Sequence, residues 1–348
     1  MQIPITPAQR GGLLMWHIGI DLHRATVVIA AVDDSGRAAE PVRIDCQDTG
    51  AILLAAGRLK PFRAVIEATS AYRWLYDLLA PHGTVLVAHP LRLRAMVQRR
   101  SKTDKLDSQL LANLLRIDQV PLSYVPPAGY QRLREVTRFR ARMTRGKAEA
   151  KVGLRALLAR HNRVAPYRVP FGPRGLAWFI KQDFGPVDND VREELLARLG
   201  HYRKQIAAVD ARLESLRGEF PQVEALLDLR GIGLYSALVV VAELGEVGRF
   251  RSARQVGAYA GLTARVRQSG DHCRHGAITR DGSPILRWVL TEAAMKVIKG
   301  DVGLRNFYTR VRKRSNAKTA RVAVARKLAE ICWKRLRRWH REKEAAAA

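Results

Sequence analysis

WHIGIDLHRATVVIAAV, residues 16–32, holds two apolar runs that are rich in β-branched side chains and are separated by a short polar turn. Such runs predict two neighbouring β-strands. Short apolar segments then alternate with amphipathic ones as far as about residue 120. The expected strands are residues 16–22, 26–32, 42–46, 64–68 and 84–88, and the expected helices begin near residues 49, 72 and 102. We therefore expect an α/β domain over residues 15–120, with helices packed on a mixed sheet.

Residues 128–218 are predicted to form two long helices, interrupted at 166–190 by a segment rich in proline and glycine. Seven apolar residues of the second helix alternate four and three apart, which predicts a coiled-coil seam. The seven are Leu195, Leu199, Tyr202, Ile206, Val209, Leu213 and Leu216. The seam can pair with the first helix or with a second subunit. We favour an antiparallel hairpin that also dimerises.

A third, mainly helical region is expected at residues 221–300, with loops marked by Gly270, Gly276 and Gly282. A basic helical tail, residues 301–348, should follow. Within it, residues 318–339 place apolar side chains on one helical face and arginines elsewhere, which predicts an amphipathic helix.

Composition narrows the class of protein. The 348 residues include 61 Lys and Arg against 32 Asp and Glu, a formal net charge of +29. A chain this basic favours a polyanionic partner, and nucleic acid is the commonest in a cytoplasm; a solvated basic surface is the alternative. No apolar run is long enough to span a membrane, and residues 1–16 lack the pattern of a secretory signal. Met15 directly precedes the first predicted strand and is a candidate alternative start. Three scattered cysteines suit a reducing cytoplasm.

Four acids form a candidate metal site. Asp21 ends the first strand, Glu67 ends a later one, and Asp104 and Asp107 share one face near the start of a helix. Two divalent ions at a phosphodiester need about four carboxylates, and carboxylate oxygens select Mg²⁺, with Mn²⁺ as the alternative ion. Each acid, taken alone, is equally explained as a turn or capping residue.

Ser269 is a candidate nucleophile. It precedes a glycine in a segment expected to be a loop, surrounded by four arginines that are candidate nucleic-acid ligands. These are Arg265, Arg267, Arg274 and Arg280. A positive environment stabilises an alkoxide and the charge of a phosphoryl transition state. Taken alone, this segment is better explained as an ordinary serine turn in a glycine-rich loop.

Several motifs in fixed order resemble a known family. GIDLH, IEATSAY, KTDKLDSQLLA, RGIGLYSA and GLTARVRQSGDHCRHGAITRDGSPILRWVLTEAA, within residues 16–300, are similar to the bacterial insertion-sequence transposases of the IS110 family. Within the family, the motifs resemble the IS1111 branch, which is itself similar to the pilin-gene inverting recombinases. Ser70, Ala264 and Arg280 depart from the residues usual in the family, which leaves the loop near Ser269 less well defined.

The resemblance implies a RuvC-like domain of RNase H fold with a DEDD acid set, an α-helical coiled-coil connector and a mainly α C-terminal transposase domain. The DEDD acids fall on Asp21, Glu67, Asp104 and Asp107, and the serine nucleophile on Ser269. It also implies an element-encoded guide RNA that pairs with donor and target DNA, and a homo-oligomer (a dimer or tetramer) in the bacterial cytoplasm, associated with the nucleoid.

Three functions follow as hypotheses. The first is an RNA-guided DNA recombinase that forms a phosphoserine link. The second is a hydrolytic two-metal nuclease of the Holliday-junction type, which uses the same acids and water. The third is a non-enzymatic nucleic-acid scaffold, for which charge alone suffices.

Overall fold

The computed structural model describes residues 14–69, 71–96, 104–269 and 272–347. The chain divides into two compact units, one comprising residues up to Val125 and the other beginning at Pro126. Each unit has its own apolar core. Among the described helices, none is both long enough and apolar enough to cross a membrane.

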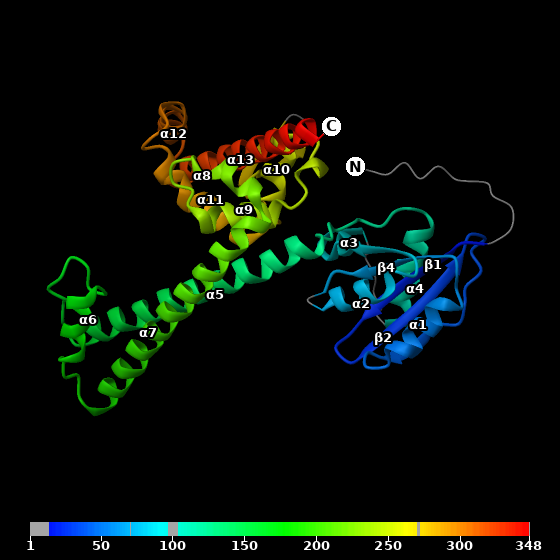
Figure 1. Cartoon of the computed structure of the whole chain (residues 1–348), viewed down its shortest axis with the longest axis horizontal. Coiled ribbons are helices and arrows are strands. Elements are labelled where there is room, and N and C mark those ends of the chain that lie inside the picture. Colours follow the sequence, from blue (N-terminus) through cyan, green and yellow to red (C-terminus); the bar gives the residue numbers. More distant parts are fainter. Residues whose placement is uncertain (1–13, 70, 97–103, 270–271, 348) are drawn as a thin grey trace. The chain divides into compact units, whose positions relative to one another are not determined.

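The first unit is built on a five-stranded sheet in the order β3-β2-β1-β4-β5 (Figure 1). The strands are β1 (Trp16–Leu22), β2 (Thr26–Asp33), β3 (Val42–Asp45), β4 (Phe62–Glu67) and β5 (Thr84–Ala88). β1, β2 and β3 pair antiparallel, whereas β4 pairs parallel to both β1 and β5. The expected mixed sheet is confirmed, with strand ends within two residues of the prediction.

Helices cover both faces of this sheet. Those of the first unit are α1 (Thr49–Gly57), α2 (Tyr72–Leu79), α3 (Pro90–Met96) and α4 (Asp104–Arg116). α1 and α2 pack on the face formed by alternate residues such as Ile18, Ile20 and Ile66. α4 contributes Leu111 and Leu115 to a second cluster with Val65, on the opposite face. The side-chain alternation of the strands therefore assigns each residue to one of two helical layers.

Gly19 allows α4 to approach β1 at backbone distance. A Cβ at this position would lie 2.0 Å from the Ser108 carbonyl oxygen and 2.4 Å from the Ala112 nitrogen. Any larger side chain would therefore separate the helix from the strand.

The second unit begins with a long helical hairpin, in which α5 (Ala128–Arg160) packs along α7 (Pro186–Ser215). A Cβ on Gly146 would meet the ring of Tyr202, and one on Gly153 would meet the side chain of Leu195. Positions seven residues later on α5 thus face positions seven residues earlier on α7, so the two helices are antiparallel, as expected. α6 (Pro173–Ile180), a short helix in the predicted interruption, was not anticipated.

The remaining helices of the second unit enclose its larger core. They are α8 (Glu224–Leu227), α9 (Leu234–Leu244), α10 (Ala253–Tyr259), α11 (Pro284–Val297), α12 (Val302–Arg314) and α13 (Ala317–Ala347). α9 is buried over almost its whole length, and α11 and α13 pack closely together beside it. Ala325, Leu328 and Cys332 of α13 are buried, so the expected amphipathic helix is confirmed.

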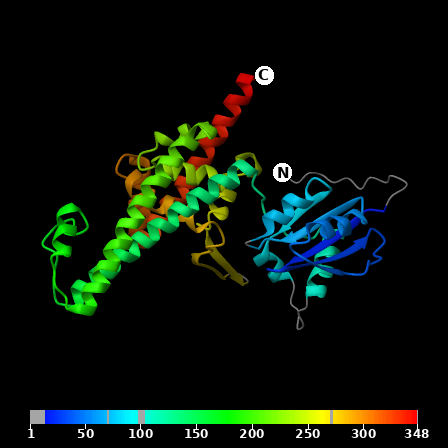
Figure 2. The same ribbon diagram turned by 60° about the horizontal axis from the view of Figure 1, so that its bottom comes forward.

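The segment expected to be a loop around Ser269 forms a β-ribbon instead. β6 (Ala264–Ser269) pairs antiparallel with β7 (His272–Ile278) (Figure 2). Gly276 lies within β7 rather than in a loop. The expectation of a loop was wrong because described residues of β6 such as Arg265 and Val266 are all exposed, so no buried face imposes the alternation of apolar residues that marks a strand.

Candidate functional site

Asp21 and Glu67 emerge from neighbouring strands on the same face of the sheet. β1 and β4 are parallel, and their last registered pair is Ile20 with Ile66, so the two acids are the next residues along each strand. Asp21 lies two residues after Gly19, which faces α4, and Glu67 lies two residues after Val65, which packs against the same helix. Strand alternation therefore directs both carboxylates to the layer of α4.

Asp107 belongs to the helix that covers this face. It directly precedes Ser108, whose carbonyl oxygen lies against Gly19 of β1. The side chains of Asp21, Glu67 and Asp107 are all partly buried. The sheet and α4 thus bring three of the four predicted acids to one side of the first unit.

The environment of Asp21 includes His23. The His23 Nε2 lies 3.1 Å from the Asp21 Oδ2, and 15% of the Asp21 side chain is exposed against 44% of that of His23. A histidine at this distance orients the carboxylate by a hydrogen bond donated through Nε2.

The fourth acid, Asp104, is the first residue of α4, and its side chain lies outside the described residues. Among the side chains that are described, no three His, Cys, Asp or Glu are grouped closely enough to hold a metal ion. Carboxylate oxygens suit a hard divalent cation, and Asp21 and Glu67 are directed to the layer of the helix that carries Asp107.

Ser269 is the last residue of β6 and pairs with His272 of β7. Its side chain lies outside the described residues, as do those of Arg267 and Arg274, whose backbones pair directly across the ribbon. The ribbon and the acids belong to different units, because Ser269 lies in the second unit and the acids lie in the first.

Two of the predicted arginines have described side chains at the base of the ribbon. Arg265 is exposed and donates to the Thr279 carbonyl oxygen at 3.3 Å. Arg280 is also exposed and adopts a φ of 60°, in the left-handed region that non-glycine residues seldom occupy. Backbone strain of this kind persists only where the surrounding structure holds it, and it often accompanies functional loops.

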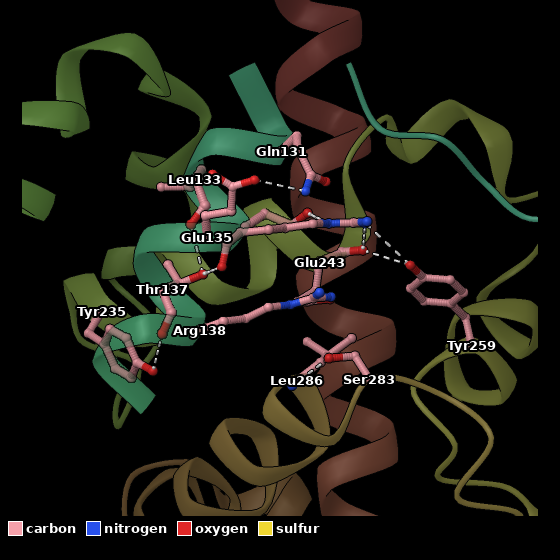
Figure 3. A network of polar contacts seen from close by, with 12 residues as sticks. Gln131, Leu133, Glu135, Thr137, Arg138, Tyr235, Glu243, Tyr259, Ser283 and Leu286 are labelled. Atoms are coloured by element: carbon pink, nitrogen blue, oxygen red, sulfur yellow. Dashed lines mark hydrogen bonds and ion pairs between the residues drawn. The ribbon is translucent and has the colours of Figure 1, made fainter. Parts of the chain in front are cut away.

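A buried polar network escaped the sequence analysis. Arg138 of α5 forms a bidentate ion pair with Glu243 of α9, at 2.8 and 2.9 Å (Figure 3). The buried Arg134 donates to the carbonyl oxygens of Ala242 and Glu243, and Tyr259 donates to the Glu243 carbonyl oxygen at 3.0 Å. The network fixes α5 to the C-terminal end of α9. A lone acid in the apolar run ALVVVAEL was the signal available in the sequence.

Comparison with protein families matches both units. A model of the "Transposase IS116/IS110/IS902 family" matches residues 223–309. A second transposase model, for the DEDD domain of IS110 elements, matches residues 18–162. A DEDD domain of this type implies an RNase H-like fold, with which the observed mixed sheet agrees.

Three curated relatives extend the comparison. A putative transposase, y4qE, of Sinorhizobium fredii is 28% identical, over 80% of this chain and 70% of its own. The transposase for insertion sequence element IS1111A of Coxiella burnetii is 22% identical, over 92% of this chain and 89% of its own. A pilin gene-inverting protein of Moraxella lacunata is 25% identical, over 77% of this chain and 78% of its own.

Proposed function

Because this chain belongs to the IS110 family of transposases, and is therefore a DNA transposase, we propose that it breaks and rejoins DNA through a covalent link to Ser269. The link would form at a composite site in which divalent ions are held by the acids of the first unit. Those acids are Asp21, Glu67, Asp104 and Asp107. The observation that carries the proposal is the placement of Asp21 and Glu67 on adjacent parallel strands, facing the helix that bears Asp107.

The acids would act by holding divalent cations at the scissile phosphate. Mg²⁺ or Mn²⁺, when bound, supplies Lewis-acid stabilisation of the phosphoryl group and of the leaving oxygen. The carboxylates would fix the ions on the rigid sheet and α4, so that little reorganisation accompanies the reaction. His23 would keep Asp21 oriented through the 3.1 Å contact.

Ser269 would act as the nucleophile. Its Oγ attacks the phosphorus and a P–Oγ bond forms, while one P–O bond of the DNA strand breaks and its oxygen leaves as a hydroxyl after taking up a proton. The serine proton passes to water. Because the phosphodiester energy is conserved in the protein–DNA link, the hydroxyl of another strand can reverse the step and restore Ser269.

Guide RNA and self-association complete the proposal. The net charge of +29 and the long arginine-rich helices can neutralise more than one polyanion. We propose that a structured RNA of the element pairs with donor and target DNA, and that a dimer or tetramer acts in the bacterial cytoplasm at the nucleoid. The α5–α7 hairpin is the candidate connector, flanked by the DEDD domain and the serine domain.

Trapping the covalent adduct tests the proposed chemistry. Purified protein, incubated with element-end DNA, its RNA and Mg²⁺, should yield a denaturation-resistant protein–DNA species that mass spectrometry maps to Ser269. Ser269→Ala should abolish this species. Ser236→Ala, which removes a serine hydroxyl elsewhere in the same unit, should not. An adduct that persists in Ser269→Ala would refute the assignment.

A separate variant tests the role of the acids. Asp21→Asn should lower the rate of adduct formation by at least about 100-fold, as removal of a group that stabilises transition-state charge does, and should leave DNA affinity nearly unchanged. Asp45→Asn, an exposed acid at the end of β3, is the control. Strand cleavage without any adduct, lost in Asp21→Asn but retained in Ser269→Ala, would instead establish the hydrolytic nuclease.

A further inference from the structure

A basic groove lies between α5 and the beginning of α11, within the second unit. It has a volume of about 560 Å³ and is lined by two elements that are far apart in the sequence. The residues of its wall that matter here are Arg142, Thr144 and Arg145 of α5, and Ser283 and Trp288 at α11. A groove of this size accommodates a nucleotide.

The positive charge of the groove is available to a ligand. Arg142 and Arg145 are exposed, and no acidic partner of either occurs among the described residues. Arg142 lies over the ring of Phe139, 5.6 Å from its centroid, a contact that leaves its charge without a counter-ion. Arg138, at the other end of the same wall, is neutralised by Glu243. The two available guanidinium groups follow one another along a single helix, as cations that track a phosphate backbone do.

Trp288 provides an aromatic face in the same groove. Its side chain is on the wall of the groove, and the residue is 38% exposed, whereas apolar side chains elsewhere on α11 such as Leu286 and Leu290 are buried. Tyr235 supports the indole from the protein side, with ring centroids 6.4 Å apart.

Tyr235 is itself immobilised. Its hydroxyl donates to the Thr137 carbonyl oxygen at 3.1 Å, and the Arg140 guanidinium lies 4.1 Å from its ring centroid. Burial raises the pKa of Tyr235 to about 12, so the hydroxyl remains a donor. The indole is therefore held on a rigid base and presented to the groove.

We propose that this groove binds an unpaired nucleotide of the DNA substrate, with the base stacked on Trp288 and the adjacent phosphates contacted by Arg142 and Arg145. An exposed indole beside two guanidinium groups that have no acidic partner among the described residues matches the two surfaces of a nucleotide, its π-face and its phosphate. Bases within a duplex are stacked on their neighbours, so only an extruded or single-stranded base can use the indole. The inference rests on the proposed function in that the nucleotide belongs to DNA undergoing strand exchange.

Binding to two matched DNA duplexes tests the stacking. One duplex is fully paired and the other contains a single unpaired nucleotide, and affinity is measured by fluorescence anisotropy in a metal-free buffer. Stacking of one base contributes about 1–3 kcal/mol, so Trp288→Ala should weaken binding of the second duplex by about 5- to 150-fold and that of the first by less than twofold. Trp288→Phe should retain most of the affinity, and Trp339→Ala on α13 is the control.

The arginines are tested by salt dependence. Arg142→Gln and Arg145→Gln should each lower the slope of log affinity against log salt by about 1 for the duplex with the unpaired nucleotide, as loss of one phosphate contact does. Arg58→Gln, an exposed arginine at the end of α1 in the first unit, should leave the slope unchanged when the salt range and DNA are the same.

A photocrosslink gives a measurement that does not depend on folding of the variants. 5-Iodouracil at the unpaired position of the DNA should crosslink to the peptide that contains Trp288 in the unsubstituted protein. Crosslinks to other peptides only, or equal affinity of Trp288→Ala for both duplexes, would overturn the inference. Tighter binding of an unpaired RNA nucleotide of the same sequence would overturn the assignment to DNA.

These outcomes are separable from failure of the proposed function. Binding without metal requires no strand breakage, so nucleotide binding in the groove can be found even if Ser269 forms no adduct. Conversely, an adduct at Ser269 together with unchanged binding by Trp288→Ala would reject the groove alone.

Discussion

At the scale of single residues, Gly19 determines how closely two predicted metal-binding elements approach. The backbone of α4 lies against the bare Cα of β1, and this contact brings the segment of Asp107 beside the strand of Asp21. The two nearest atoms that a Cβ would meet belong to the backbone, which cannot rotate away as a side chain can. Substitution here must therefore move the whole helix.

Gly19→Ala should lower both stability and activity. Overpacking of this kind costs about 1–3 kcal/mol, because α4 must move away from the sheet. Gly57→Ala, at the end of α1 with nothing within 4 Å of the added carbon, is the control and should leave stability nearly unchanged or slightly raised. Urea denaturation and the rate of adduct formation measure the two effects. Unchanged stability of Gly19→Ala would contradict the close packing.

Cys332 leads to a prediction about pH. Burial raises the pKa of its thiol to about 12, whereas an unfolded thiol ionises near 8.5. The contribution of this group to stability is complete below the unfolded pKa and is lost as pH rises towards the folded one. Between pH 9 and 11, the free energy of unfolding should therefore fall more steeply in the unsubstituted protein than in Cys332→Ala, by up to about 1 kcal/mol per pH unit.

Thiol modification at pH 8 provides the second measurement for Cys332. The exposed Cys273 should react fastest. Cys46, where burial and the neighbouring Asp45 raise the pKa, should react more slowly. Cys332 should react only on unfolding, and its modification in the native protein would show that α13 does not bury it.

At the scale of secondary-structure elements, the contact between α5 and α7 depends on two glycines seven residues apart. A Cβ on Gly146 would lie 2.3 Å from the Tyr202 ring, and one on Gly153 would lie 2.9 Å from Leu195. Large side chains of α7 thus occupy the space above small residues of α5. At Tyr202 and Leu195, the apolar seam predicted on α7 therefore packs against glycines of α5, which have no side chain.

Gly146→Ala should destabilise the hairpin even though alanine is the better helix former. The expected cost is about 1–3 kcal/mol from overpacking, offset in part by the helix propensity of alanine. Gly200→Ala on α7, with nothing within 4 Å of the new carbon, should instead gain about 0.5–1 kcal/mol. Denaturation midpoints compare the two variants. Gly146→Ala should cost less stability when it is introduced into Tyr202→Ala than when it is introduced into the unsubstituted protein, because the ring that the new carbon meets is then absent.

The success of prediction differs between elements for a physical reason. β1, β2 and β5 are apolar because they are buried, so their composition alone identifies them. The acids at the ends of β1 and β4 stand out against those runs for the same reason. α3 and α6 are short and begin with proline, and the sequence offers too few turns to establish a period. The β6–β7 ribbon has no buried face and therefore no hydrophobic signal.

Contacts between distant segments could not be predicted. The groove combines Arg145 with Trp288, and the polar network combines Arg138 with Glu243, each pair separated by more than 100 residues. No local pattern specifies which helix faces which, because that choice depends on the packing of the whole second unit. Composition indicated a nucleic-acid partner but not where the protein would contact it.

At the scale of the whole molecule, we expect the net charge of +29 to dominate association with DNA. A protein that contacts six to ten phosphates loses about 10³–10⁵ in affinity between 50 and 200 mM salt. We expect a loss in this range for duplex DNA, because cations occur on several helices of the second unit. Anisotropy titrations at four salt concentrations measure it. A loss below about tenfold would indicate that the charge is not used in binding DNA.

The two independent cores have a practical consequence. Among the described residues, the β-sheet core contains none beyond Val125, and the larger helical core contains none before Pro126. The gene can therefore be cut between these codons and expressed as two polypeptides, each with its own apolar interior. The polypeptide that carries the acids can then be mixed with the polypeptide that carries Ser269. Recovery of adduct formation in the mixture would show that the two halves of the site need not lie in one chain.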